Sequence, residues 1–167
     1  MQPFVMVCYL PCFPMTATIG TDAMINDKQI ILIADDETDL TWSMSRHIQR
    51  ENPNVFVYSA VNGMQALDMV RSIRPHLLIT DLRMPGLNGF KLIEKARAVA
   101  PSLKVIVISA YHSRDIHEKL RALRIDGFLE KPFDLKKLRA LSDALLSIDE
   151  PARNAFEFSD LGLGLTG

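Results

Sequence analysis

The sequence predicts a wound α/β domain in which five strand–helix units form one five-stranded parallel sheet. Apolar runs and amphipathic segments alternate five times along the chain, with short connections between them, which is the pattern of such a sheet. The apolar runs are continuous and rich in β-branched residues, as expected of strands that are buried on both faces. With 167 residues, of which 48% are hydrophobic and 23% are charged, the chain suits one globular domain with additional residues at its ends.

The individual elements follow from the positions of apolar runs, turn residues and prolines. The predicted strands cover residues 30–34, 55–58, 76–81, 105–109 and 127–130. The predicted helices cover residues 39–51, 64–73, 90–98, 113–123 and 135–148. Asn62-Gly63 forms the turn into the second helix, which Pro75 closes. Asn88 is suited to cap the third helix and Pro101 to end it.

The two ends of the chain differ from this domain, which we expect to cover residues 28–148. We expect residues 1–27 to be a poorly ordered extension, because they carry few charges and three prolines interrupt any period. A hydrophobic docking segment within them is the alternative, and Met24 is a candidate for the natural start of the protein. Residues 149–167 lose the alternating pattern, and we expect them to form a flexible acidic tail.

The overall composition limits the classes of partner. The formal net charge is −1, so no long-range positive field attracts nucleic acid or acidic membranes, and we expect no direct binding to either. The two cysteines, Cys8 and Cys12, lie outside the predicted domain, which argues against a disulfide framework or a cysteine metal site. No apolar run approaches the roughly 18 residues that a membrane span needs. A cytoplasmic location fits these observations best.

Charged and polar side chains follow four of the predicted strands. Asp35 and Asp36 come after the first strand, Asp81 after the third, Ser109 after the fourth and Lys131 after the fifth. The carboxyl ends of the first, third and fourth strands of a wound sheet meet at its central crevice, so we expect these side chains to converge there. Three carboxylates repel one another unless a cation joins them, and ligands that are all oxygens favour Mg²⁺.

This group of side chains is suited to phosphoryl transfer onto a carboxylate. Mg²⁺ and the Lys131 ammonium would offset the charge of a phosphoryl group, and the Ser109 hydroxyl would bond to one of its oxygens. The product would be an aspartyl phosphate on Asp81. Each residue alone has an ordinary structural explanation, such as a helix cap or a surface charge, but the coincidence of all of them favours a site.

The chain resembles the receiver domain of two-component response regulators over about residues 28–148. The motifs that carry the resemblance are Asp35-Asp36, DLRMPGLNG from Asp81, Ser109-Ala110, and FLEKPF around Lys131. The resemblance implies a flavodoxin-like three-layer sandwich and phosphorylation of Asp81 by a histidine kinase or a histidine phosphotransfer protein. It also implies Mg²⁺ held by Asp36, Asp81 and the backbone carbonyl of Arg83, with Asp35 acting partly through water.

The resemblance further implies a switch and a rim around the phosphorylation site. Ser109 and Phe128 occupy the two switch positions, and because Phe128 has no hydroxyl, its inward state must depend on packing alone. Arg83 and Tyr111 occupy variable rim positions, and we expect these bulky side chains to limit the access of water and to lengthen the phosphorylated state. The other rim residues are Met84 and Ala110.

Several other residues are expected to be structural. The four histidines lack acidic or cysteine partners at ligand spacing, so metal binding by them is not expected; they are His47, His76, His112 and His117. His47 as a phosphorelay histidine is an alternative to a solvated position. Trp42 and Met44 are interpreted as packing of the first helix, and a basic group on the last helix as a solvated face; this group comprises Lys136, Lys137 and Arg139.

The preferred function is a stand-alone phosphoacceptor signalling protein that is not an enzyme beyond chemistry on its own Asp81. It would act by binding an unknown downstream protein or by passing the phosphoryl group onward, and homodimer formation is left open. One rival is a Mg²⁺-dependent phosphohydrolase with an aspartyl nucleophile. Against it, Asp81 follows the third strand and Arg83 stands where a second aspartate is expected. The other rival is an interaction module that works without phosphorylation.

Overall fold

The computed structural model describes residues 28–147 except residues 51 and 112. The expectations for residues 1–27 and 149–167, including Met24 and the two cysteines, therefore lie outside the described residues, as does His112. The strands are β1 (Gln29–Ala34), β2 (Val55–Ala60), β3 (Leu77–Asp81), β4 (Lys104–Ser109) and β5 (Gly127–Glu130). The helices are α1 (Thr38–Gln49), α2 (Gly63–Ile73), α3 (Gly89–Val99), α4 (Arg114–Ala122) and α5 (Leu135–Ser147).

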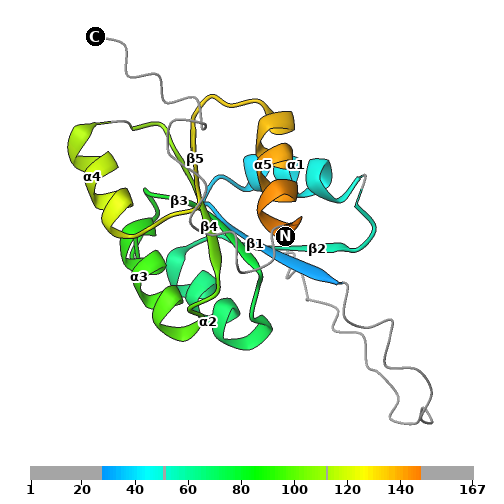
Figure 1. Ribbon diagram of the computed structural model, residues 1–167, viewed down its shortest axis with the longest axis horizontal. Helices are drawn as coiled ribbons and strands as arrows, with labels where there is room; N and C mark the ends of the chain where they lie inside the picture. Colours follow the sequence, from blue (N-terminus) through cyan, green and yellow to red (C-terminus); the bar gives the residue numbers. More distant parts are fainter. Residues whose placement is uncertain (1–27, 51, 112, 148–167) are drawn as a thin grey trace, which may run out of the picture.

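The five strands form one parallel sheet in the order β2-β1-β3-β4-β5. Figure 1 shows α1 and α5 on one face of this sheet and α2, α3 and α4 on the other. The predicted fold is therefore confirmed, including the central position of the first, third and fourth strands. This order places the carboxyl ends of β1, β3 and β4 next to one another, which is the edge where ligands bind in such sheets.

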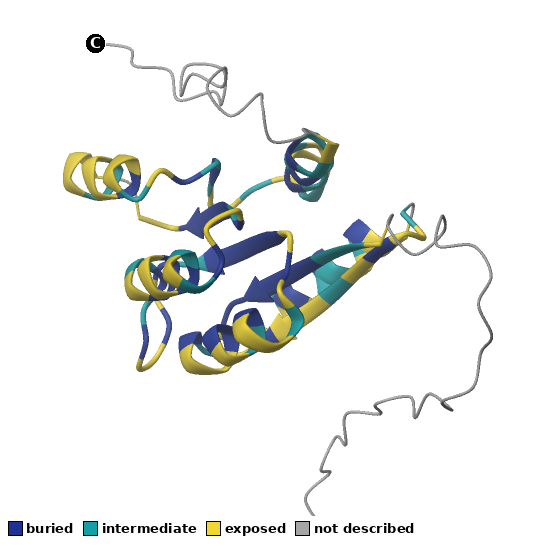
Figure 2. Cartoon of the chain, turned by 60° about the horizontal axis from the view of Figure 1, so that its bottom comes forward, coloured by how far each residue is buried: buried dark blue, intermediate teal, exposed yellow. Residues whose placement is uncertain are grey.

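Two hydrophobic clusters hold the three layers together. Alternate residues of each central strand point to opposite faces, so Ile31 and Ile33 pack under α1 and α5, whereas Leu32 and Ala34 pack under α2 and its neighbours. The central strands are almost entirely buried, as Figure 2 shows. The continuous apolar runs of the sequence thus reflect burial on both faces of the sheet.

Four helices begin at side chains that accept a backbone hydrogen bond, which satisfies an N–H group that the first turn leaves free. Asn62 accepts from Gln65, Asn88 from Lys91, Ser113 from Ile116 and Asp134 from Lys136. The predicted cap at Asn88 is therefore confirmed.

Element boundaries differ from the prediction by a few residues. Strand β3 begins at Leu77, one residue after the predicted start. His76 lies just before it, and its Nδ1 accepts a hydrogen bond from the backbone N–H of Ile30 at 2.9 Å. His76 therefore has a structural role beside the start of β1. Among the residues that the structure describes, no helix is long and apolar enough to cross a bilayer.

The interpretation of Trp42 as a packing residue is wrong, whereas that of Met44 is confirmed. Both residues belong to α1. Met44 is fully buried on the side of the helix that faces the sheet, but Trp42 is 65% exposed. The guanidinium of Arg46, one turn further along α1, lies 5.5 Å from the centre of the indole ring. Because the two residues differ by about 200° around the helix axis, only one of them faces the sheet.

Gly89, the first residue of α3, lies close against the end of β3. Its backbone N–H donates to the carbonyl of Leu82, directly after that strand, at 3.0 Å. A Cβ at this position would clash with the carbonyl oxygen of Asp81 and would lie 2.8 Å from the Cα of Leu82. Both obstacles are backbone atoms and cannot rotate away, so α3 must shift from the strand if a methyl group is added.

We predict that Gly89→Ala lowers the free energy of unfolding by about 2 kcal/mol, within the range of overpacked cores. Chemical denaturation measures this change. Lys91→Ala, on the exposed side of the same helix turn, is the control and should change stability by less than about 0.5 kcal/mol. Equal stability of the Gly89→Ala variant and the parent would contradict the close contact.

Candidate functional site

Three carboxylates gather at the ends of β1 and β3. Asp35 and Asp36 follow β1 directly, and Asp81 is the last residue of β3. One oxygen of each lies within 4.8 Å of the others. Asp35 is buried at 1% exposure, Asp81 is partly buried, and Asp36 is exposed. The structure therefore brings together the three acids that were predicted to converge.

The Lys131 ammonium joins this cluster from the end of β5. Its Nζ donates to Asp35 Oδ2 at 2.9 Å and to Asp81 Oδ2 at 3.0 Å. It also donates to Glu37 Oε1 at 2.8 Å. Glu37 is a residue of the site that the sequence does not predict. Its position as the third acid in the run that starts at Asp35 was the available signal, but the reach of its side chain across to β5 was not visible in the sequence.

Backbone hydrogen bonds hold the loops of the site in place. The N–H of Glu37 donates to Asp35 Oδ1 at 2.9 Å, and the N–H of Arg83 donates to Asp81 Oδ1 at 3.1 Å. The N–H of Lys131 donates to the carbonyl of Ser109 at 2.9 Å, which ties the end of β5 to the end of β4. Asp35, Asp81 and Lys131 are thus held in position by hydrogen bonds at the ends of their strands.

Burial and ion pairing act in opposite directions on the ionisable groups. Burial raises the pKa of Asp35 above its ordinary value, although hydrogen bonds from the Glu37 N–H and from Lys131 oppose this shift. Burial would lower the pKa of Lys131, but the hydrogen bonds to Glu37, Asp35 and Asp81 together raise it above its ordinary value. Lys131 is therefore a firmly charged ammonium at neutral pH, as an electrostatic partner for an anion must be.

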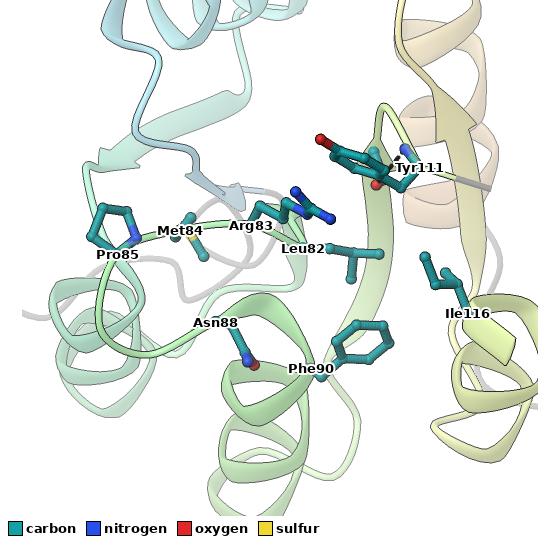
Figure 3. Close-up of a pocket in the computed structure, with 9 residues that line it drawn as sticks. Leu82, Arg83, Met84, Pro85, Asn88, Phe90, Tyr111 and Ile116 are labelled. Atoms are coloured by element: carbon teal, nitrogen blue, oxygen red, sulfur yellow. Dashed lines mark hydrogen bonds between the residues drawn. The ribbon is translucent and has the colours of Figure 1, made fainter. Parts of the chain in front are cut away.

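A cavity of about 490 Å³ opens beside this cluster, between the loop after β3 and the start of α4. Figure 3 shows Arg83 and Tyr111 across one side of it and Phe90 with Ile116 at the other. The guanidinium of Arg83 lies 3.5 Å from the centre of the Tyr111 ring, which is a close cation–π contact. The two predicted rim residues therefore contact each other.

The other predicted rim residues have different environments. Met84 is buried at 7% exposure and belongs to the hydrophobic cluster under α2 and α3, although it also lines the cavity. It is thus a core residue as much as a rim residue, because the turn after β3 folds it inward. Ala110 is exposed directly after β4.

The two predicted switch residues lie on β4 and β5. Ser109 is fully buried and lines the cavity, and its Oγ accepts a hydrogen bond from the N–H of Tyr111 at 3.1 Å. Phe128 is buried at 5% exposure, with its ring centre 5.4 Å from that of His117 on α4. Phe128 thus lies inside the domain through packing alone, since its ring has no polar atom.

A match to a protein family model shows the family to which the chain belongs. Residues 31–143 match the model of the response regulator receiver domain. The chain belongs to the response regulator receiver domain family. Its family model covers all five strands except the first two residues of β1, and it includes every acid of the cluster and Lys131.

Relatives of known name support the same assignment. The receiver domain is 31% identical over 116 residues to sporulation initiation phosphotransferase F of Bacillus subtilis, an alignment that covers 70% of this chain and 90% of the relative. It is 34% identical over 139 residues to the response regulator MprA of Mycobacterium avium, covering 80% of this chain. The aligned part spans 59% of the length of MprA.

Solved structures share the fold of this receiver domain. The N-terminal domain of an uncharacterized protein from Wolinella succinogenes is 31% identical, with a TM-score of 0.65 and coverage of 70% of this chain and 93% of that domain. The chemotaxis protein CheY4 of Vibrio cholerae has the same TM-score at 22% identity, with coverage of 71% and 98%. The second likeness shows the fold alone.

Proposed function

We propose that this receiver domain accepts a phosphoryl group on Asp81 from a histidine kinase or a histidine phosphotransfer protein. The observation that supports this most strongly is the ion cluster in which Lys131 reaches Asp81 at 3.0 Å beside Asp35 and Asp36. A carboxylate nucleophile, an ammonium and oxygen ligands for a metal are the groups that phosphoryl transfer to an acid requires.

The transfer is a substitution at phosphorus. A carboxylate oxygen of Asp81 bonds to the phosphorus, and the bond from phosphorus to the donor breaks, with the bonding electron pair leaving on the donor. Lys131 offsets the charge on the phosphoryl oxygens. The hydroxyl of Ser109, which accepts from the Tyr111 N–H in this structure, donates its proton in a hydrogen bond to one of these oxygens.

The donor set of the acid cluster fits Mg²⁺. All three side chains offer oxygens, and Asp36 is the most exposed of them, whereas both oxygens of Asp35 and both oxygens of Asp81 already accept hydrogen bonds. Asp36 and Asp81 are the direct ligands that membership of the receiver family favours. Asp35 would act through water, and the carbonyl of Arg83 would complete the protein ligands. The bound ion would supply neutralisation of the charge shared by the carboxylates and the phosphoryl group.

Signalling follows from the phosphorylated state. The domain acts in the cytoplasm without enzymatic turnover of other substrates and without direct contact to nucleic acid. Its output is the binding of a downstream protein or the onward transfer of the phosphoryl group. The relative from Bacillus subtilis is named a phosphotransferase, sporulation initiation phosphotransferase F. This name supports onward transfer of the phosphoryl group as an output of this receiver domain.

Incubation with acetyl phosphate and MgCl₂, followed by intact mass measurement, tests the proposed function. The parent chain should gain one phosphate, and Asp81→Asn should gain none, because the amide is not a nucleophile of comparable strength. Asp68→Asn, an exposed acid on α2, is the control and should gain one phosphate as the parent does. Rapid turnover of small phosphate esters would favour the phosphohydrolase instead, and a parent without adduct would favour the module that works without phosphorylation.

The metal site predicts a change in the response of stability to Mg²⁺. MgCl₂ should raise the unfolding temperature of the parent, because the ion binds only the folded cluster. Asp36→Asn should lose this response and, without the metal, be more stable by up to about 1 kcal/mol because one repulsive charge is gone. Asp39→Asn, in the first turn of α1, should respond as the parent does. An undiminished Mg²⁺ response in Asp36→Asn would contradict the proposed ligands.

The contact between Arg83 and Tyr111 predicts a longer phosphorylated lifetime than the site would have without it. Replacing both by Ala should shorten this lifetime severalfold, because water reaches the aspartyl phosphate more easily. The decay of the phosphorylated form after removal of acetyl phosphate measures it, with Lys137→Ala on the exposed side of α5 as the control. Equal lifetimes would show that these side chains do not limit hydrolysis.

A further inference from the structure

The side chain of Glu37 contacts the site without a structural task in its own helix. Glu37 occupies the N-cap position of α1, but its side chain makes no capping hydrogen bond. Its Oε1 instead accepts from the Lys131 Nζ at 2.8 Å, which is the shortest of the three contacts of that ammonium. Glu37 therefore acts on Lys131 rather than on the first turn of α1.

All three protons of the Lys131 ammonium are engaged by these contacts, since an ammonium has three donors and three carboxylate partners lie at 2.8–3.0 Å. A phosphoryl group carries roughly 1.5 to 2 negative charges and three strong acceptor oxygens. Lys131 can bond to it only after it gives up one of its present partners.

Burial decides which partner is released. The side chain of Asp35 is 2% exposed, so loss of its contact with Lys131 would leave a buried carboxylate unpaired. The side chain of Asp81 is 12% exposed and is still a carboxylate when the donor arrives, because it loses its negative charge only when its bond to phosphorus forms. The side chain of Glu37 is 63% exposed, so water can replace the ammonium around it. Glu37 is the partner that separates at the lowest cost.

We propose that Glu37 is a releasable positioning residue that holds Lys131 toward the acid cluster before phosphorylation and competes with the incoming phosphoryl group for it. This inference rests on the proposed function of Asp81. The negative charge of Glu37 also opposes the approach of an anionic donor. Removal of this charge therefore accelerates phosphorylation, and the effect grows with the negative charge of the donor.

Phosphorylation kinetics of the full chain with two donors test the proposal. Glu37→Gln keeps the shape of the side chain and removes its charge. With acetyl phosphate, a dianion, kcat/KM should rise by up to about fivefold, the factor that corresponds to an exposed ion pair. The gain should come chiefly from a lower KM, because the charge acts on donor binding. With phosphoramidate, a monoanion, the gain should be smaller.

Two variants separate a specific contact from a general effect of charge. Asp39→Asn removes the same charge from an exposed residue two positions further along α1 and should leave the rates with both donors unchanged. Glu37→Asp keeps the charge and should stay closer to the parent than Glu37→Gln does. Denaturation curves of all variants show whether each one is folded at the assay temperature.

The outcomes that overturn the inference differ from those that overturn the proposed function. A parent chain that takes up no phosphate overturns the proposed function and this inference with it. A parent that is phosphorylated on Asp81, with Glu37→Gln reacting at the same rate or more slowly, overturns the inference alone. Equal acceleration with both donors also overturns it, because the effect would then not depend on the charge of the donor. Equal acceleration by Asp39→Asn overturns it as well, because the effect would then not depend on the contact with Lys131.

Discussion

The arrangement of the site depends on one interaction, the contact of the Lys131 ammonium with carboxylates from two other strands. The acids lie at the ends of β1 and β3, and Lys131 lies at the end of β5. Like charges at such short range repel, so the acids can stay close only if a cation lies between them. The ammonium provides that charge within the chain itself, and the parallel sheet brings it into reach because all its strands end at one edge.

The same constraint explains how the site is prepared for phosphoryl transfer. A side chain that neutralises the acids in the free domain is already close to the place where a phosphoryl group would carry its charge. Pre-positioned charge of this kind needs little reorganisation during a reaction. The backbone hydrogen bonds from Arg83 to Asp81 and from Lys131 to Ser109 hold the loops at the strand ends, whereas the exposed side chain of Glu37 is held only by its contact with Lys131 among the hydrogen bonds of the site.

The sequence predicted the fold and the convergence of the acids with Lys131 because both follow from where strands end. Continuous apolar runs mark buried strands, and the fixed hand and order of a wound sheet then place their ends together. The pattern of strands does not show in which direction an exposed side chain extends, so it did not predict the contact of Glu37 with Lys131. Trp42 was misassigned because residue type alone does not give the direction of a side chain around a helix, whereas the neighbouring burial of Met44 does.

A double-mutant cycle between Asp81 and Lys131 tests the central claim most directly, because it measures the coupling of the two side chains rather than the effect of either alone. The free energies of unfolding of the parent, Asp81→Asn, Lys131→Met and the double variant would be compared without Mg²⁺. The observed 3.0 Å contact predicts a favourable coupling energy of about 1–2 kcal/mol. Additive effects within about 0.3 kcal/mol would show that the two residues do not interact and would contradict the account.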